Sequence, residues 1–227
     1  MKGLLYKHFT CYLFVFIEMV LFAGGCGLVA VMGTATNREK RIPAEYKFNN
    51  GEKILVLVNQ PGWLNAKANL LYHLTQAIYR SFIMKLRIPP QCLISYDELC
   101  DFRSNRTDFW KLTPIQVGEA LGANKVLVVY IEDCQLYEMG ESGYHKGWLS
   151  ARAVVLDVGS GKRVWPKNAN SKDIKVGFEF EREGAEAAVT RLADACAYCV
   201  IRYFYDCPKD KFKIAEDISG IGWGDWK

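Results

Sequence analysis

The chain has 227 residues, of which half are apolar, and its 29 basic and 25 acidic side chains leave a net charge of +4. A charge this small gives no support for binding to nucleic acid, which requires many basic residues gathered on one surface. About 180 residues lie beyond the first 50, roughly the length of one domain with a buried core.

The chain opens with the order of a secretory signal. Lys2 and Lys7 precede an apolar stretch over residues 9–22, and small residues follow it directly before Cys26. Small side chains let the backbone lie extended in a signal peptidase, so we predict cleavage after residue 25. The residues of this cleavage site are Ala23, Gly24 and Gly25.

Cys26 makes the segment similar to a bacterial lipoprotein signal, in which the thiol receives a diacylglyceryl group and the cysteine becomes the new amino terminus. The alternative is an uncleaved membrane anchor, because residues 9–33 contain one charge, Glu18, and about 20 apolar residues span a bilayer. Both interpretations attach the remaining chain to a membrane. Apart from lipid on Cys26, we expect no cofactor and no metal.

The composition divides the chain into four parts. A linker after the signal ends in a charged run up to Arg41 and then Pro43. Fully extended, about 20 residues reach roughly 70 Å, so the domain stays close to its membrane. The predicted parts are a signal peptide (1–25), a lipidated cysteine with linker (26–50), an α/β domain (51–210) and an aromatic tail (211–227).

The first half of the domain alternates strand and helix patterns. An unbroken apolar run at 54–58, followed by proline and glycine, indicates a buried strand. Apolar residues then recur at helical spacing over 65–85. A brief strand is expected at 92–95, and a capping-box order with proline opens a short helix at 113–122. Residues 125–131 are typical of a central strand covered on both faces.

The second half is richer in strands. A polar loop is expected over residues 137–147. Two strands at 148–157 and 163–165 are joined by a turn of glycine and serine, which indicates a hairpin. Strict alternation at 175–180 predicts a strand with Val176, Phe178 and Phe180 on its buried side, and apolar spacing over 183–206 predicts the last helix.

This order of elements predicts an α/β fold. We expect a single three-layer-type domain with a mixed sheet of about five strands and two main helices, behind an amino-terminal signal or anchor.

Two segments carry a family resemblance. Residues 120–129 (ALGANKVLVV) lead into the central strand, and residues 151–165 (ARAVVLDVGSGKRVW) form the following hairpin. Together with the element order they resemble the α/β domain of penicillin-binding-protein activator lipoproteins, the curli-secretion lipoprotein and the amino-terminal domain of the Tol translocation protein. The resemblance implies a bacterial envelope lipoprotein whose domain binds another protein, and it transfers no catalytic residue.

Six cysteines remain after the signal and the lipidated position. In a chain that leaves the cytoplasm, an even number is compatible with disulfides. The spacing of Cys196 and Cys199 also matches a redox pair, but a position inside a helix favours small buried residues instead. The candidates for disulfide pairing are Cys92, Cys100, Cys134, Cys196, Cys199 and Cys207.

No catalytic pattern emerges, so we predict that the chain is not an enzyme. Residues 158–162 (VGSGK) lack the first glycine of a phosphate loop and precede a strand, whereas that loop precedes a helix. His73 is expected to be a partly buried structural residue, and His145 to lie at the surface within a polar loop.

The carboxy-terminal tail carries glycines between large apolar residues. Glycine disfavours a helix here, and exposed tryptophans are enriched at contact surfaces, so Trp223 and Trp226 are candidates for partner binding. The alternative is a tail that folds back on its own domain.

The favoured function is a non-catalytic, membrane-anchored envelope lipoprotein that binds a protein partner or contributes to an assembly, including an assembly of its own copies. We expect it to face the periplasm of a bacterium, at the outer rather than the inner membrane. The alternative is a small-ligand-binding or thiol-redox protein on an uncleaved transmembrane anchor.

Overall fold

The computed structural model describes residues 40–61, 69–140, 144–180 and 184–216. The chain divides into two units, Met1–Lys40 and Arg41–Lys227, and the helices and strands among the described residues belong to the second.

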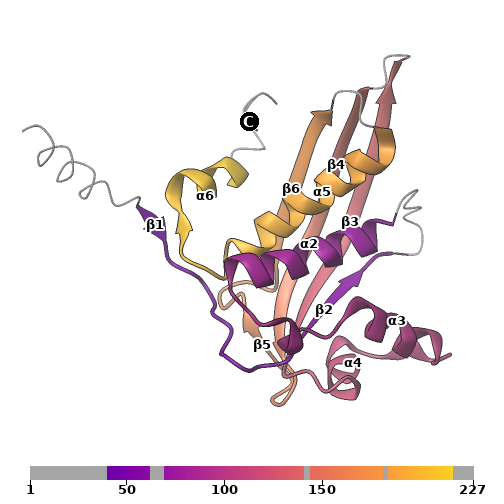
Figure 1. The fold of residues 1–227 in the computed structure, drawn as a ribbon, viewed down its shortest axis with the longest axis vertical. Helices are drawn as coiled ribbons and strands as arrows, with labels where there is room; N and C mark the ends of the chain where they lie inside the picture. Colours follow the sequence, from indigo (N-terminus) through magenta and orange to yellow (C-terminus); the bar gives the residue numbers. More distant parts are fainter. Residues whose placement is uncertain (1–39, 62–68, 141–143, 181–183, 217–227) are drawn as a thin grey trace, which may run out of the picture. The chain divides into compact units, whose positions relative to one another are not determined.

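A five-stranded mixed sheet forms the centre of this unit (Figure 1). Strands β2 and β3 run parallel, β3 and β4 are antiparallel, and β4 pairs along its other edge with both β5 and β6. The strands are β2 (Ile54–Asn59), β3 (Lys125–Met139), β4 (Tyr144–Asp157), β5 (Lys162–Trp165) and β6 (Lys172–Phe180).

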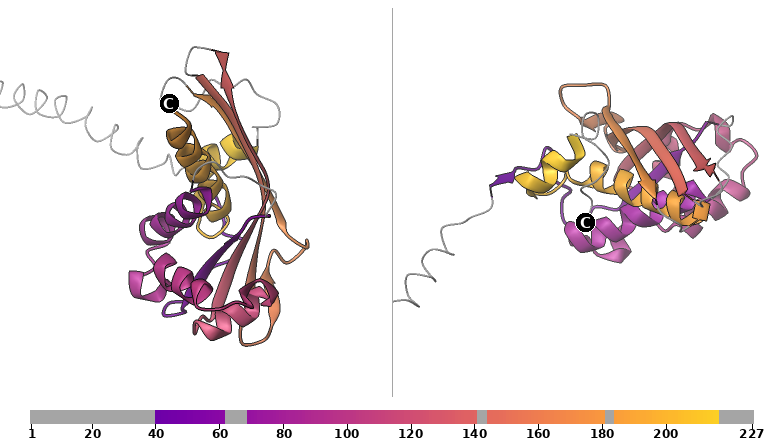
Figure 2. Two further views of the ribbon diagram at one scale, coloured as in Figure 1. Left: turned by 90° about the vertical axis from the view of Figure 1, so that its right-hand side faces the viewer. Right: turned by 90° about the horizontal axis from the view of Figure 1, so that it is seen from above.

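Two long helices, α2 (Leu70–Lys85) and α5 (Gly184–Ile201), lie side by side on one face of the sheet, as the left view of Figure 2 shows. The predicted α/β class, mixed sheet of about five strands and two main helices are thereby confirmed. The shorter elements are β1 (Arg41–Ile42), the 3-10 turns η1 (Pro90–Cys92) and η2 (Phe109–Lys111), α3 (Tyr96–Ser104), α4 (Pro114–Ala120), β7 (Cys207–Pro208) and α6 (Lys209–Glu216).

The sheet is apolar on both faces near β2 because alternate residues of a strand point to opposite sides. Ile54 and Val56 pack into a core with α2 and α5. Leu55 lies in a second, smaller core with Leu99 of α3 and Val117 of α4. The continuous apolar runs of β2 and β3 are therefore explained by burial on two faces.

The predicted polar loop over residues 137–147 is wrong. Outside residues 141–143, which are not described, this segment continues β3 to Met139 and begins β4 at Tyr144, and the two strands pair antiparallel up to Met139 and Tyr144 (Figure 1). Leu136 packs against the main core, and His145, expected at the surface, is only 8% exposed. Polar residues alternate here with core-facing ones, which is the pattern of a half-buried strand.

Between β2 and α4, one predicted strand is wrong and one helix was not predicted. Residues 92–95 do not form a strand: only Leu93 bridges to Ile54, after the turn η1. Helix α3 was not predicted, although Ser95 caps it by accepting a hydrogen bond from the Glu98 backbone N–H at 3.1 Å. That serine and glutamate have the spacing of a capping box.

The last helix is shorter than predicted. It begins at Gly184 and ends at Ile201, and the chain then forms β7 and α6. Helix α6 spans Lys209–Glu216 and therefore crosses the boundary that we placed between the domain (51–210) and the tail (211–227). Within the described ranges, no helix has both the length and the apolar character needed to cross a membrane.

Candidate functional site

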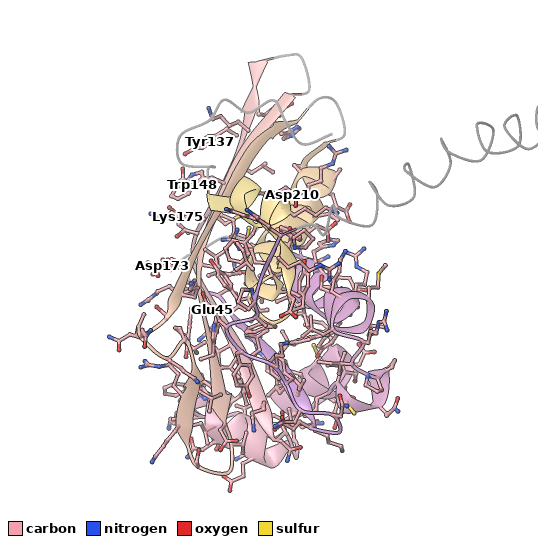
Figure 3. All side chains as sticks on the ribbon, turned by 90° about the vertical axis from the view of Figure 1, so that its left-hand side faces the viewer. Glu45, Tyr137, Trp148, Asp173, Lys175 and Asp210 are labelled. Carbon is pink, nitrogen blue, oxygen red and sulfur yellow. The ribbon has the colours of Figure 1, made fainter. Side chains whose placement is uncertain are left out.

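None of the described helices covers the outer part of β3, β4 and β6 on the sheet face opposite α2 and α5 (Figure 2, left). Leu149, Ala151, Ile174 and Val176 point into the main core, so their neighbours along β4 and β6 point the other way. Figure 3 shows Tyr137, Trp148, Asp173 and Lys175 on this side. We call it the open face, made of Tyr130, Asp133, Gln135, Tyr137, Lys146, Trp148, Ser150, Arg152, Asp173 and Lys175.

A bulge in β3 sets which side chains reach the open face. The pairing with β4 shifts by one residue between Ile131 and Asp133. Even-numbered residues of β3 face the open side before the bulge, as Tyr130 does, and odd-numbered residues do so after it, as Gln135 and Tyr137 do. Without this shift, the polar residues after the bulge would point into the core.

Aromatic side chains dominate the exposed apolar area of the open face. Tyr137 is 54% exposed and Trp148 is 37% exposed. Trp148 lies between Gln135 of β3 and Gly177 of β6 in the strand register. Since Gly177 has no side chain, one flank of the indole is left without a cross-strand neighbour.

Polar contacts fix the side chains around these aromatic rings. Glu132 accepts from Arg152 Nε at 2.6 Å and from the Ser150 hydroxyl at 3.2 Å. Gln135 donates to Asp133 at 3.1 Å and accepts from the Tyr137 hydroxyl. Two separate groups of hydrogen bonds, one around Glu132 and one around Gln135, therefore hold these side chains in one arrangement before any partner binds.

The β3–β4 hairpin that carries the open face packs against α5 on its other side. A Cβ added to Gly147 would lie 3.0 Å from Leu192 Cδ1 of α5 and 3.1 Å from Leu136 Cδ1. The absence of a side chain at this position lets α5 approach β4 closely. The open face is therefore supported by the core along the length of α5.

The chemistry of the open face suits contact rather than catalysis. It contains two acidic and three basic side chains, two exposed aromatic rings and no histidine or cysteine. No cluster of three or more metal-ligating side chains occurs in the described parts of the chain. Aromatic residues among mixed charges are typical of protein-binding surfaces.

A second polar cluster, at the start of β3, has its charges satisfied internally. Lys125 Nζ lies 2.9 Å from Glu52 Oε1 and 2.7 Å from Asp157 Oδ1, and Asp157 also accepts from the Ser160 backbone N–H at 2.9 Å. Desolvation lowers the pKa of Lys125, but the hydrogen bonds to Asp157 and Glu52 outweigh it and raise that pKa to about 12. We interpret this cluster as structural.

Several predicted site residues lie outside the described residues. These are the cleavage and lipidation positions and the tail tryptophans, which stay predictions: Ala23, Gly24, Gly25, Cys26, Trp223 and Trp226. The side chains of Phe178 and Phe180 are likewise not described, while Val176 is buried as expected.

The six candidate disulfide cysteines are all free thiols, so the expected pairing is absent from this structure. Cys196, Cys199 and Cys207 are buried, whereas Cys92, Cys100 and Cys134 are partly buried. Burial raises the pKa of the Cys134 and Cys199 thiols to about 11 each, which disfavours the reactive thiolate.

No protein-family model and no curated protein matches the chain. Among solved structures, it is similar to the lipoprotein GNA1162 from Neisseria meningitidis at 14% identity and a TM-score of 0.39, over 62% of this chain and 91% of that one. The PelC dodecamer from Paraburkholderia phytofirmans matches at 13% identity and a TM-score of 0.40, over 73% and 96%. The carboxy-terminal domain of LpoB from Salmonella enterica matches at 16% identity and a TM-score of 0.33, over 57% and 84%.

These likenesses concern the fold. Bacterial lipoproteins are among the structures to which this chain is similar. At these identities and scores they carry no inference about activity or partner, so the function is argued from the open face.

Proposed function

We propose that this chain is a non-catalytic, membrane-anchored lipoprotein of the bacterial envelope whose α/β domain binds a protein partner through the open face. Lipid on Cys26 is the proposed anchor. The domain would face the periplasm, at the outer membrane.

The exposure of Trp148 and Tyr137 on a supported sheet face is the observation that carries this proposal. Large aromatic side chains lose little conformational entropy on binding and dominate the energy of protein interfaces. Because hydrogen bonds already order the surrounding polar groups, a partner would meet a surface that needs little rearrangement.

The mixed charge of the open face adds selectivity. Arg152 and Asp173 are opposite in the register of β4 and β6, and Ser150 is opposite Lys175. A partner of complementary pattern would be favoured, and one that brings like charges opposite Lys175 or Asp173 would be rejected.

Photo-crosslinking in the native bacterium tests the open face. A benzoylphenylalanine at position 148 should yield one specific protein adduct, which a Tyr137→Ala background reduces about tenfold, as expected for loss of a central aromatic contact. The matched control is position 110, because Trp110 is 76% exposed on η2 and lies outside the open face. Equal adducts from both positions, or no effect of Tyr137→Ala, would contradict the proposal.

The anchor needs a separate test. We would measure the mass of the mature amino terminus with and without an inhibitor of the lipoprotein signal peptidase. A diacylglyceryl cysteine at residue 26 supports the lipoprotein, and its loss in Cys26→Ala is the control. An intact Met1 in membranes, insensitive to the inhibitor, would instead mean an uncleaved helix.

A further inference from the structure

A cavity of about 310 Å³ opens at the carboxyl end of β2, away from the open face. Its walls come from the last residues of β2, the start of α2, and α3, η2 and α4. Clefts outside the carboxyl ends of strands are frequent ligand sites in α/β proteins. The volume is at the lower end for such sites, which run from about 300 to 1,000 Å³, so it suits a small ligand.

The lining combines an apolar floor with one charge. Leu57, Leu99 and Val117 belong to or pack against the smaller core and form the apolar part. Arg103 is the single charged residue in the lining that the structure describes. A ligand that satisfies this cavity therefore carries one negative charge on an apolar body.

Arg103 has no carboxylate partner among the described residues. Its guanidinium carbon lies 5.5 Å from the centre of the Phe109 ring, a stacked arrangement that leaves the N–H edges of the guanidinium to bind an anion. The remaining polar groups in the lining include the Asn59 carboxamide, the Tyr96 hydroxyl and the Cys100 thiol.

Arg106 offers a contrast on the same segment. Its guanidinium carbon lies 5.4 Å from the Phe102 ring centre, much as Arg103 stacks on Phe109. Arg106 is, however, neutralised by Asp108, which accepts from Nε at 3.0 Å and from Nη2 at 3.1 Å. The two arginines share their stacking and differ in whether a carboxylate is present, and only Arg103 lines the cavity.

We infer that this cavity binds a small monocarboxylate with an apolar or aromatic body, whose carboxylate pairs with Arg103. The planar guanidinium presents two parallel N–H groups, which match the two oxygens of a carboxylate. Because the cavity and the open face are built from different residues, this inference does not rest on the proposed partner binding.

Phenylacetate and its neutral amide, phenylacetamide, are the probes for this site. We would titrate each into the full chain in detergent micelles and follow binding by calorimetry. The acid should bind saturably in the millimolar range, and the amide should bind about tenfold more weakly, the loss expected for one charge-assisted pair. Arg103→Gln should weaken the acid about tenfold and remove its preference over the amide.

Arg106→Gln is the matched control and should leave the acid affinity within about twofold of the parent chain. Alkylation locates the bound probe: phenylacetate should slow modification of Cys100, which lines the cavity, and leave Cys92, which does not, unchanged. The inference is overturned by equal effects of the two arginine variants, by equal binding of acid and amide, by equal protection of both cysteines, or by no saturable binding up to about 10 mM acid.

Discussion

Gly118 marks the closest approach between α4 and the sheet. A Cβ at this position would lie 2.5 Å from Val126 Cγ2 and 3.0 Å from Val158 Cγ2. Val126 is fully buried, and valine has little rotamer freedom with which to move aside. The residue at 118 therefore sets the distance between this helix and β3.

We expect Gly118→Ala to destabilise the fold by about 1–3 kcal/mol, because the extra methyl group overpacks this contact. Urea unfolding measures the change in the free energy of unfolding. Gly159→Ala is the control: its Cβ would have one neighbour, Asp157 Oδ2 at 4.0 Å, so a change within about 0.5 kcal/mol is expected. Similar losses in both variants would contradict the packing argument.

Asp157 links stability to acid pH. Hydrogen bonds from Lys125 and Ser160 lower the pKa of this carboxyl from 3.8 to about 2 in the folded chain. A carboxyl whose pKa is lower in the folded than in the unfolded chain stabilises the fold at pH values above its unfolded-state pKa. That contribution is lost as the pH falls through the folded-state pKa. The relevant window is therefore from about pH 4 down to about pH 2.

In Asp157→Asn, the loss of stability across this window should be smaller than in the parent chain by roughly 1–2 kcal/mol, since the asparagine does not titrate. Unfolding in urea at a series of pH values tests this. Asp206→Asn is the comparison: hydrogen bonds from the Ala44 backbone N–H and from Lys47 also lower the pKa of Asp206. The Lys47 and Asp206 side chains are 67% and 49% exposed, so solvent screens this contribution and the pH profile should change less than in Asp157→Asn. An identical profile in Asp157→Asn and the parent chain would refute the assignment.

Among the elements, α6 depends on one buried arginine. Arg202 is 5% exposed and donates from Nη1 to the Phe212 carbonyl at 2.8 Å and from Nη2 to the Tyr203 hydroxyl at 2.9 Å. Its guanidinium carbon also lies 4.5 Å from the Phe212 ring centre. The fork of the guanidinium thus ties α6 to the end of α5.

Arg202→Lys should release α6, because the lysine keeps the charge but does not bridge both acceptors. We expect faster hydrogen exchange in α6 and a loss of roughly 2–3 kcal/mol in the free energy of unfolding. Arg80→Lys, at an exposed pair with Asp194, should change stability by no more than about 0.5 kcal/mol. Unchanged protection of α6 in Arg202→Lys would refute this role.

Elements with strong periodicity were predictable, and those that depend on tertiary contacts were not. The apolar runs of β2 and β3 and the spacing in α2 follow from burial alone. The signal for α3 was present at Ser95 and Glu98 but is short. The outer part of the β3–β4 hairpin was missed because the bulge after Ile131 shifts the alternation of polar and core residues in β3, so that Gln135 is out of phase with the apolar run before it.

The site was less predictable than the fold because it is assembled from distant segments. Trp148 lies in a strand that was predicted, but its exposure depends on the register with β3 and on Gly177 of β6. The stacking of Arg103 likewise requires α3 and η2 to lie together. Neither relation follows from spacing along the chain.

At the scale of the whole molecule, the buried thiols distinguish a structural from a redox protein. In the native chain at neutral pH, Cys196, Cys199 and Cys207 should not react with a disulfide reagent, because they are buried and burial raises the pKa of the first two. In denaturant they should react fully. Peptide mass mapping after labelling identifies each site, and Cys92, which is partly buried, is the internal control.

Rapid native-state labelling of Cys196 or Cys199, or a native disulfide between them, would favour the thiol-redox alternative. Either result would leave the open face and the anion cavity to be judged by their own experiments.

The parallel pairing of β2 with β3 has a consequence for how the chain folds. Lys53 and Asn124, which are hydrogen-bonded where these strands begin, are 71 positions apart, whereas β3 ends at Met139 and β4 begins at Tyr144. Closing the longer loop costs more entropy, so the antiparallel strands can form early while β2 joins late. Until then the apolar run of β2 has no partner strand. During synthesis, which proceeds from the amino end, this apolar segment exists before its partner strand β3 and is exposed to aggregation.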